Sequence, residues 1–201
     1  MERTVTLQDG GQVVIRRMRP DDGERSFAFF AALPPEDRKY LRTDVTRHDV
    51  VERRVKELDS GRVERLVAVV GDRIVADGSL ELVGHGWGDG VAEVRLIVAQ
   101  PYQRRGLGTL MARELFFLAA HHKVERVVVR MMRPQSGAIR IFRKLGFDEE
   151  FLIPEHVRDQ SGSWQDMIIM RCNLEAMWRE LEALVEETDM KRQIEERTGL
   201  G

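Results

Sequence analysis

The stretch of sequence that decides the fold is Gln103-Arg104-Arg105-Gly106-Leu107-Gly108-Thr109. A β-branched, apolar run precedes it over residues 92–99, and Pro101 ends that strand because proline has no backbone N–H to pair. Apolar residues at helical spacing follow, so a helix begins near Gly106 or Leu107. The first N–H groups of a helix lack internal partners, and glycines let a ligand approach them closely. The stretch therefore predicts an anion-binding loop between a strand and a helix.

Two better-known phosphate loops share the glycines but not the other residues. A P-loop needs Gly-Lys followed by Ser or Thr, whereas Gly108 is followed by Thr109 and Leu110. A dinucleotide-binding loop needs a third Gly or Ala where Met111 stands. The remaining pattern, Gln/Arg-x-x-Gly-x-Gly, resembles the acetyl-CoA loop of the GNAT superfamily of N-acetyltransferases. The alternative is a glycine-rich turn that binds nothing.

Two further stretches resemble the same superfamily. From Gln135 to Phe147 the chain is similar to the second GNAT motif, Asn-x-x-Ala-x-x-x-Tyr-x-x-x-Gly-Phe, which lies beside the pantetheine arm. Gln135 replaces the usual Asn, and Phe142 replaces the usual Tyr, whose hydroxyl often protonates the departing CoA thiolate. Residues 7–38 are similar to the start of the GNAT modules of bacterial protein lysine acetyltransferases.

The resemblance implies one α/β domain over residues 1–172. Its central sheet is expected to be mixed but mostly antiparallel, splayed at the fourth strand and flanked by helices. Residues 173–201 are expected to add a C-terminal amphipathic helix with a frayed end, because Leu174, Met177 and Trp178 share one face and Asn173 can cap it. Whether that face packs on its own domain or forms a homodimer stays open.

Composition excludes several classes of function. A chain of 201 residues with 42% hydrophobic residues can bury one sizeable core. A net charge of -2 provides no overall attraction to nucleic acid or to an anionic membrane. The single cysteine, Cys172, excludes an internal disulfide and a cysteine-based zinc site, and no metal is expected. Without a signal-peptide pattern or a membrane-length apolar run, a cytoplasmic protein is expected.

The resemblance implies acetyl-CoA as the acetyl donor and places it along the strand end, the glycine loop and the second motif. Backbone groups at the strand end would bond the pantetheine amides, and an N–H near Val98 would stabilise the thioester oxyanion. Arg104 and Arg105 are expected to add charge-assisted contacts to phosphate. The expected acetyl-CoA residues are Ile97, Val98, Ala99, Gln103, Arg104, Arg105, Gly106, Leu107, Gly108, Thr109, Gln135 and Phe142.

Glu93 is the expected catalytic base. A lysine amine has a pKa of about 10.4, so it must lose a proton before it attacks a thioester at neutral pH. Glu93 lies in the strand that leads to the loop and matches a glutamate commonly used as base in the similar lysine acetyltransferases. The alternative is a structural glutamate paired with Arg95 or another arginine. The arginines from Arg38 to Arg65 are expected on solvated faces.

These features together predict acetyl-CoA-dependent N-acetylation by direct attack of an amine. The favoured acceptor is a protein lysine, and a small-molecule amine is the alternative acceptor. Gln135 and Phe142 also leave open a CoA-binding sensor or interaction module without turnover. No nucleic acid or membrane partner is expected.

Overall fold

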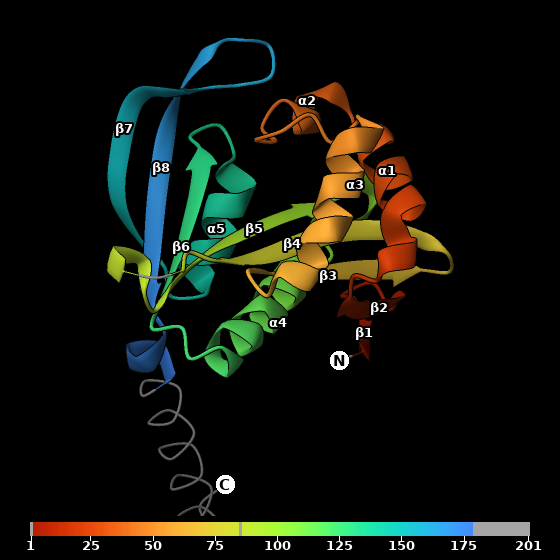
Figure 1. Cartoon of the computed structure of the whole chain (residues 1–201), viewed down its shortest axis with the longest axis horizontal. Helices are drawn as coiled ribbons and strands as arrows, with labels where there is room; N and C mark the ends of the chain where they lie inside the picture. The colour runs from red at the N-terminus through yellow and green to blue at the C-terminus, as the bar shows by residue number, and fades with distance from the viewer. Residues whose placement is uncertain (1, 85, 179–201) are drawn as a thin grey trace, which may run out of the picture.

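The computed structural model describes residues 2–84 and 86–178 of the chain (Figure 1). Within them the strands are β1 (Glu2–Thr6), β2 (Gln12–Arg17), β3 (Val63–Val70), β4 (Arg73–Leu82), β5 (Val91–Val98), β6 (Arg126–Met132), β7 (Asp148–Arg158) and β8 (Trp164–Asn173). They form one sheet in the order β1-β2-β3-β4-β5-β6-β8-β7. Neighbouring strands run antiparallel except β5 and β6, which run parallel.

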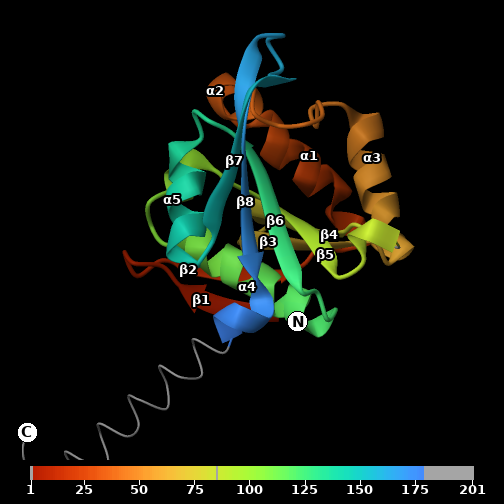
Figure 2. The same cartoon turned by 90° about the vertical axis from the view of Figure 1, so that its left-hand side faces the viewer.

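Helices cover both faces of this sheet. They are α1 (Gly23–Ala31), α2 (Pro35–Arg38), α3 (His48–Lys56), α4 (Leu107–His121) and α5 (Ser136–Lys144). The helices α1 and α3 lie on one face, and α4 and α5 lie on the other (Figure 2). On β3, Val67 and Val69 join the core that includes Phe30 of α1, whereas Leu66 and Ala68 join the core beneath α4. The alternation of side chains along a strand thus supplies two separate cores.

The sheet opens between β5 and β6. Their pairing runs only from Val91 opposite Arg126 to Glu93 opposite Val128. Beyond that point β5 continues along β4, and β6 continues along β8, so the two strands diverge (Figure 1). This is the splay predicted at the strand over residues 92–99. That strand is the fifth rather than the fourth because Glu2–Thr6 forms an additional strand, β1, which pairs with β2.

The predicted C-terminal helix begins as expected. The Asn173 side chain accepts the Ala176 N–H at 3.1 Å and so caps the helical residues 174–178. Leu174 is buried, and the Trp178 ring centroid lies 5.7 Å from that of Phe117 on α4. The first turn therefore packs on its own domain. The predicted stripe beyond Trp178 and its pairing with a second subunit lie outside the described residues. No described helix combines the length and apolarity that crossing a bilayer requires.

Candidate active site

The predicted anion-binding loop connects β5 to α4. After a 3-10 turn at Gln100–Tyr102, Arg104 and Gly106 both adopt positive φ values, of 59° and 87°. These two residues turn the chain so that α4 begins at Leu107, and the Leu110 N–H donates to the Gly106 carbonyl at 3.1 Å. The N–H groups of the helical residues before Leu110 are therefore available to a ligand at the helix start, as the sequence predicts.

The two glycines of the loop have different structural roles. A Cβ on Gly106 would lie 3.4 Å from the Gln8 side chain, and its positive φ also favours glycine. A Cβ on Gly108 would lie 2.9 Å from Cδ1 of Ile141 on α5. Gly108 therefore allows α4 and α5 to approach closely, in addition to any role in binding a ligand.

The side chains of the loop mostly fasten it to the sheet. Arg105 forms an ion pair with Asp9 and donates to the Pro101 carbonyl at 3.1 Å, so its guanidinium is engaged within the protein. The Gln103 amide donates to the Val98 carbonyl at 2.9 Å. Arg104 and Thr109 are exposed. Of the two predicted phosphate-binding arginines, Arg104 is therefore the one that points into solvent.

The end of β5 directs backbone groups toward the opening. The Ala99 N–H donates to the Val75 carbonyl of β4 at 2.9 Å. Because successive residues of an antiparallel strand direct their backbone groups to opposite sides, those of Val98 face away from β4. That is the side from which β6 has diverged. Val98 thus presents a backbone N–H to the opening, where an oxyanion donor is predicted.

The two residues that depart from the second GNAT motif, Gln135 and Phe142, have structural roles. The Gln135 side-chain oxygen accepts the Met132 N–H at 2.7 Å and closes the turn from β6 into α5. Phe142 is buried and packs edge-on against Phe147, with ring centroids 5.2 Å apart, while Phe147 stacks on Phe116. Phe142 therefore contributes to the core and has no hydroxyl to donate a proton.

Glu93 lies at the vertex of the opening and is held by two arginines. Its carboxylate forms an ion pair with Arg42, whose Nη1 lies 3.3 Å from Oε2, and it accepts Arg130 Nη1 at 2.9 Å. Arg95, the pairing partner considered first, binds Glu81 instead at 2.7 Å. Both oxygens of Glu93 are thus occupied. A base role is favoured when one arginine gives way to the acceptor, because the paired arginines stabilise the charged carboxylate and so weaken it as a base.

The expectation that the arginines from Arg38 to Arg65 are solvated is wrong for two of them. Arg54 binds Asp77 at 2.8 Å and Arg65 is buried, whereas Arg42 remains partly exposed while it pairs with the buried Glu93. Burial, together with the positive charge of Arg95, lowers the pKa of Arg42 to about 10. Arg42 and Glu93 are 51 residues apart, so no local pattern in the sequence could have paired them.

Arg42 is carried by the segment between α2 and α3, and the β7–β8 hairpin holds this segment in place. The backbone N–H of Gln160 donates to Lys39 O at 3.1 Å. Its side-chain amide donates to the carbonyls of Leu41 and Thr43, at 3.2 and 3.0 Å. The tip of the hairpin and the α2 region accordingly lie together in both views (Figures 1 and 2). Sequence reasoning missed this contact for the same reason that it missed Arg42.

Comparison with known proteins identifies the family. The profile of the "Acetyltransferase (GNAT) family" matches residues 28–147. The chain belongs to the GNAT acetyltransferase family. Solved structures agree in fold: RimJ of Mycobacterium smegmatis in complex with CoA-disulfide is 19% identical, with 90% of this chain and 93% of that chain covered and a TM-score of 0.72. The GNAT domain of S. lividans PAT is also 19% identical, with 86% and 96% covered and a TM-score of 0.69.

Other solved GNAT structures with a similar fold are of enzymes named for different acceptors. A spermidine N-acetyltransferase chimera from Vibrio cholerae and hSSAT is 16% identical, covers 84% of this chain and 99% of its own, and has a TM-score of 0.69. A ribosomal-protein-alanine N-acetyltransferase from Brucella melitensis is 20% identical, covers 79% and 98%, and has the same TM-score. Membership of the GNAT family makes the chain an N-acetyltransferase, whereas the acceptor has to be argued from the residues of this chain.

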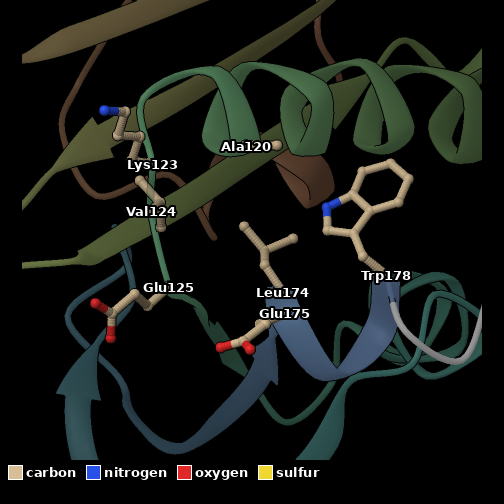
Figure 3. A pocket seen from close by; sticks show the side chains of 7 residues that line it. All are labelled: Ala120, Lys123, Val124, Glu125, Leu174, Glu175 and Trp178. Carbon is tan, nitrogen blue, oxygen red and sulfur yellow. The ribbon is translucent and has the colours of Figure 1, made fainter.

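A cavity of about 360 Å³ lies away from the GNAT opening (Figure 3). Its lining residues come from the C-terminal end of α4, from the connection between α4 and β6, and from the helical turn after β8; they are Ala120, Lys123, Val124, Glu125, Leu174, Glu175 and Trp178. The glycine loop lies at the opposite end of α4, so this cavity is not part of the proposed acetyl-CoA site. Among the residues that the structure describes, no group of His, Cys, Asp and Glu could hold a metal ion.

Proposed function

We propose that this GNAT domain transfers the acetyl group of acetyl-CoA to a lysine amine of a protein. The observation that carries the proposal is the opening between β5 and β6, with the first turn of α4 at one end and Glu93 at its vertex. Such an opening brings donor and acceptor together in a fixed geometry. A lysine acceptor is favoured by the resemblance of residues 7–38 to bacterial protein lysine acetyltransferase modules.

Acetyl-CoA is proposed to lie along this opening. Its pyrophosphate would accept the N–H groups of Leu107 to Thr109, where the helix dipole favours an anion, and Arg104 is exposed beside them. The Val98 N–H would stabilise the thioester oxyanion, and such a donor contributes about 3 kcal/mol. Arg105 and the Ala99 N–H already have partners, so their proposed role is to hold the loop and the strand end.

In the proposed reaction the acceptor nitrogen attacks the thioester carbon, and the C–S bond breaks as the C–N bond forms. One proton of the acceptor ammonium passes to Glu93, directly or through a water, before the attack. The second leaves the nitrogen as the amide forms and is taken up by solvent or by the thiolate. Because a thiol such as that of cysteine has a reference pKa of about 8.5, the CoA thiolate can leave without the proton that Phe142 is unable to supply.

The test is incubation of the full chain with acetyl-CoA and lysine-containing proteins, with mass spectrometry to locate new acetyl groups. Acetyl-lysine is the expected product. Acetylation of small amines alone would show that the acceptor is a small molecule and would leave the proposed acetyl transfer unchanged.

The occupied oxygens of Glu93 also favour a second candidate, a CoA-binding sensor. That function would be supported if calorimetry detected acetyl-CoA binding while no amine was acetylated.

A further inference from the structure

Three guanidinium groups surround the vertex of the opening. Arg95 stands two residues beyond Glu93 on β5, and Arg130 stands two residues beyond Val128 on β6. Since side chains repeat every two residues along a strand, both arginines project from the same face as Glu93. Arg42 reaches the same carboxylate from the α2–α3 segment. The two diverging strands and the segment above them therefore each place an arginine at this site.

The positive charges lie outside and the negative charges lie beneath them. The side chains of Arg42, Arg95 and Arg130 are 36%, 38% and 46% exposed, whereas those of Glu81 and Glu93 are 27% and 7% exposed. Three cations thus share two carboxylates. The Arg95 Nε is buried and has no hydrogen-bond partner among the described residues. An approaching molecule meets guanidinium N–H donors before it meets a carboxylate.

We propose that the acceptor of this enzyme carries a carboxylate beside its amine and that Arg95 and Arg130 bind this carboxylate. Charge-assisted bonds from guanidinium to carboxylate are among the stronger polar contacts that a protein can make. An acceptor rich in positive charge, such as a polyamine or a lysine flanked by basic residues, would be repelled by the same groups. This inference rests on the proposed function, because it names the acceptor class of that site.

Binding of such an acceptor would also prepare Glu93 for its role. A carboxylate bound at Arg130 competes with Glu93 for the N–H that now occupies Oε2 at 2.9 Å. As Arg130 turns to the acceptor, this oxygen keeps only the longer contact of 3.3 Å from Arg42 and becomes a better acceptor for the ammonium proton. Acceptor binding and release of the base are then the same event, and an acceptor without the carboxylate would leave Glu93 paired.

Matched acceptors test the proposal on the full chain. The peptide arm compares one lysine flanked by Asp with the isosteric Asn-flanked peptide and with an Arg-flanked peptide. A second arm uses free glutamate, a small molecule that also carries a carboxylate beside its amine. This arm distinguishes a small-molecule acceptor from a protein acceptor. We expect kcat/KM for the Asp-flanked peptide to exceed that for the Asn-flanked peptide by about tenfold, equivalent to about 1.4 kcal/mol.

Two variants and a control locate the effect. Arg95→Gln and Arg130→Gln should abolish the preference for Asp over Asn, whereas Arg133→Gln should keep it, because Arg133 is exposed and pairs with Asp166. With the unaltered protein, the preference should shrink as ionic strength rises. This salt dependence keeps the test valid if a variant fails to fold. Calorimetry of the same peptides in the presence of CoA measures the preference without turnover.

The outcomes separate this inference from the proposed function. Equal kcat/KM for the Asp-flanked and Asn-flanked peptides would overturn the inference and leave lysine acetylation intact. Tighter, arginine-dependent binding of the Asp-flanked peptide without acetylation would overturn the proposed function. It would still support binding of a carboxylate-bearing ligand at these arginines. Acetylation of free glutamate alone would support a carboxylate-bearing acceptor and would show that this acceptor is a small molecule rather than a protein. If the protein neither acetylates an acceptor nor binds the Asp-flanked peptide preferentially, both the inference and the proposed function are overturned.

Discussion

Glu93 is a buried carboxylate whose surroundings are charged rather than apolar. Arg42 and Arg130 occupy both of its oxygens, and each arginine is partly exposed. An exposed guanidinium can rotate toward another anion at low cost, which a fully buried ion pair cannot do. The acceptor-free protein therefore keeps the proposed base paired, yet within reach of an incoming amine.

The first prediction concerns this residue. Glu93→Gln keeps the size of the side chain but cannot take up the ammonium proton, so acetyl transfer should fall by about 10²-fold or more, with acetyl-CoA affinity unchanged. Raising the pH should partly restore transfer, because more of the acceptor amine, with a pKa of about 10.4, is then already deprotonated. Steady-state kinetics across pH measures both effects.

Glu64→Gln is the matched control for this variant, because Glu64 pairs with His122 and Arg17 away from the vertex and should be dispensable for transfer. Normal turnover in Glu93→Gln would assign Glu93 to structure alone. Failure of that variant to fold would point to the structural ion pair instead.

At the level of elements, the start of α4 depends on its loop. Arg104 and Gly106 hold left-handed conformations, and the Gln8 N–H and the Asp9 side chain fasten Arg105 to the β1–β2 turn. The loop is thus positioned before any ligand arrives. Such preorganisation lowers the entropic cost of binding.

The second prediction tests this helix end. Arg104→Glu places an anion beside the first turn of α4, so the Kd for acetyl-CoA should rise by about tenfold, or about 1.4 kcal/mol, and the effect should weaken in high salt. Lys123→Glu makes the same charge change just past the other end of α4 and should leave the Kd unchanged. Calorimetry of both variants decides the matter. Equal affinities would remove the loop from the acetyl-CoA site.

At the level of the whole molecule, one buried ion pair links the N-terminal part of the sheet to the helices above it. Arg16 of β2 binds Asp22, just before α1, through two bonds of 2.6 and 2.8 Å, and the Arg19 N–H adds a third at 2.8 Å. Burial alone would raise the pKa of Asp22, but the bonds from Arg16 and Arg19 outweigh it and hold this pKa below its ordinary value of 3.8.

The third prediction follows from this pair. Asp22→Ala leaves Arg16 buried without its partner and should lower the free energy of unfolding by about 3–5 kcal/mol. Asp21→Ala is the matched control, since the Asp21 side chain is exposed and its loss should cost at most about 0.5 kcal/mol. Urea unfolding measures both. Similar values for the two variants would show that the pair contributes nothing.

The pH dependence of stability has a definite sign. A carboxyl with a depressed folded-state pKa contributes stability that is present above its unfolded pKa and is lost as the pH falls through the folded value. The stability advantage of the unaltered protein over Asp22→Asn should therefore be complete above about pH 4 and shrink on further acidification. A constant difference across that range would contradict the assignment.

The sequence by itself determined the features that depend on near neighbours. The β-branched run over residues 92–99, the glycine loop and the apolar spacing after Leu107 predicted strand, turn and helix, because local backbone preferences and side-chain periodicity act over a few residues. The same holds for Asn173, whose side chain caps the turn that follows it. These local signals sufficed to identify the GNAT family.

Only the tertiary structure decided the surroundings of Glu93. Arg42 and Arg130 lie 51 and 37 residues away along the chain, and the β7–β8 hairpin holds the segment that carries Arg42. The divergence of β5 from β6 places Arg95 and Arg130 on one face of the same opening. Charges interact through space over several ångströms whatever their separation in sequence, so their pairing leaves no local pattern and is fixed only when the sheet is assembled.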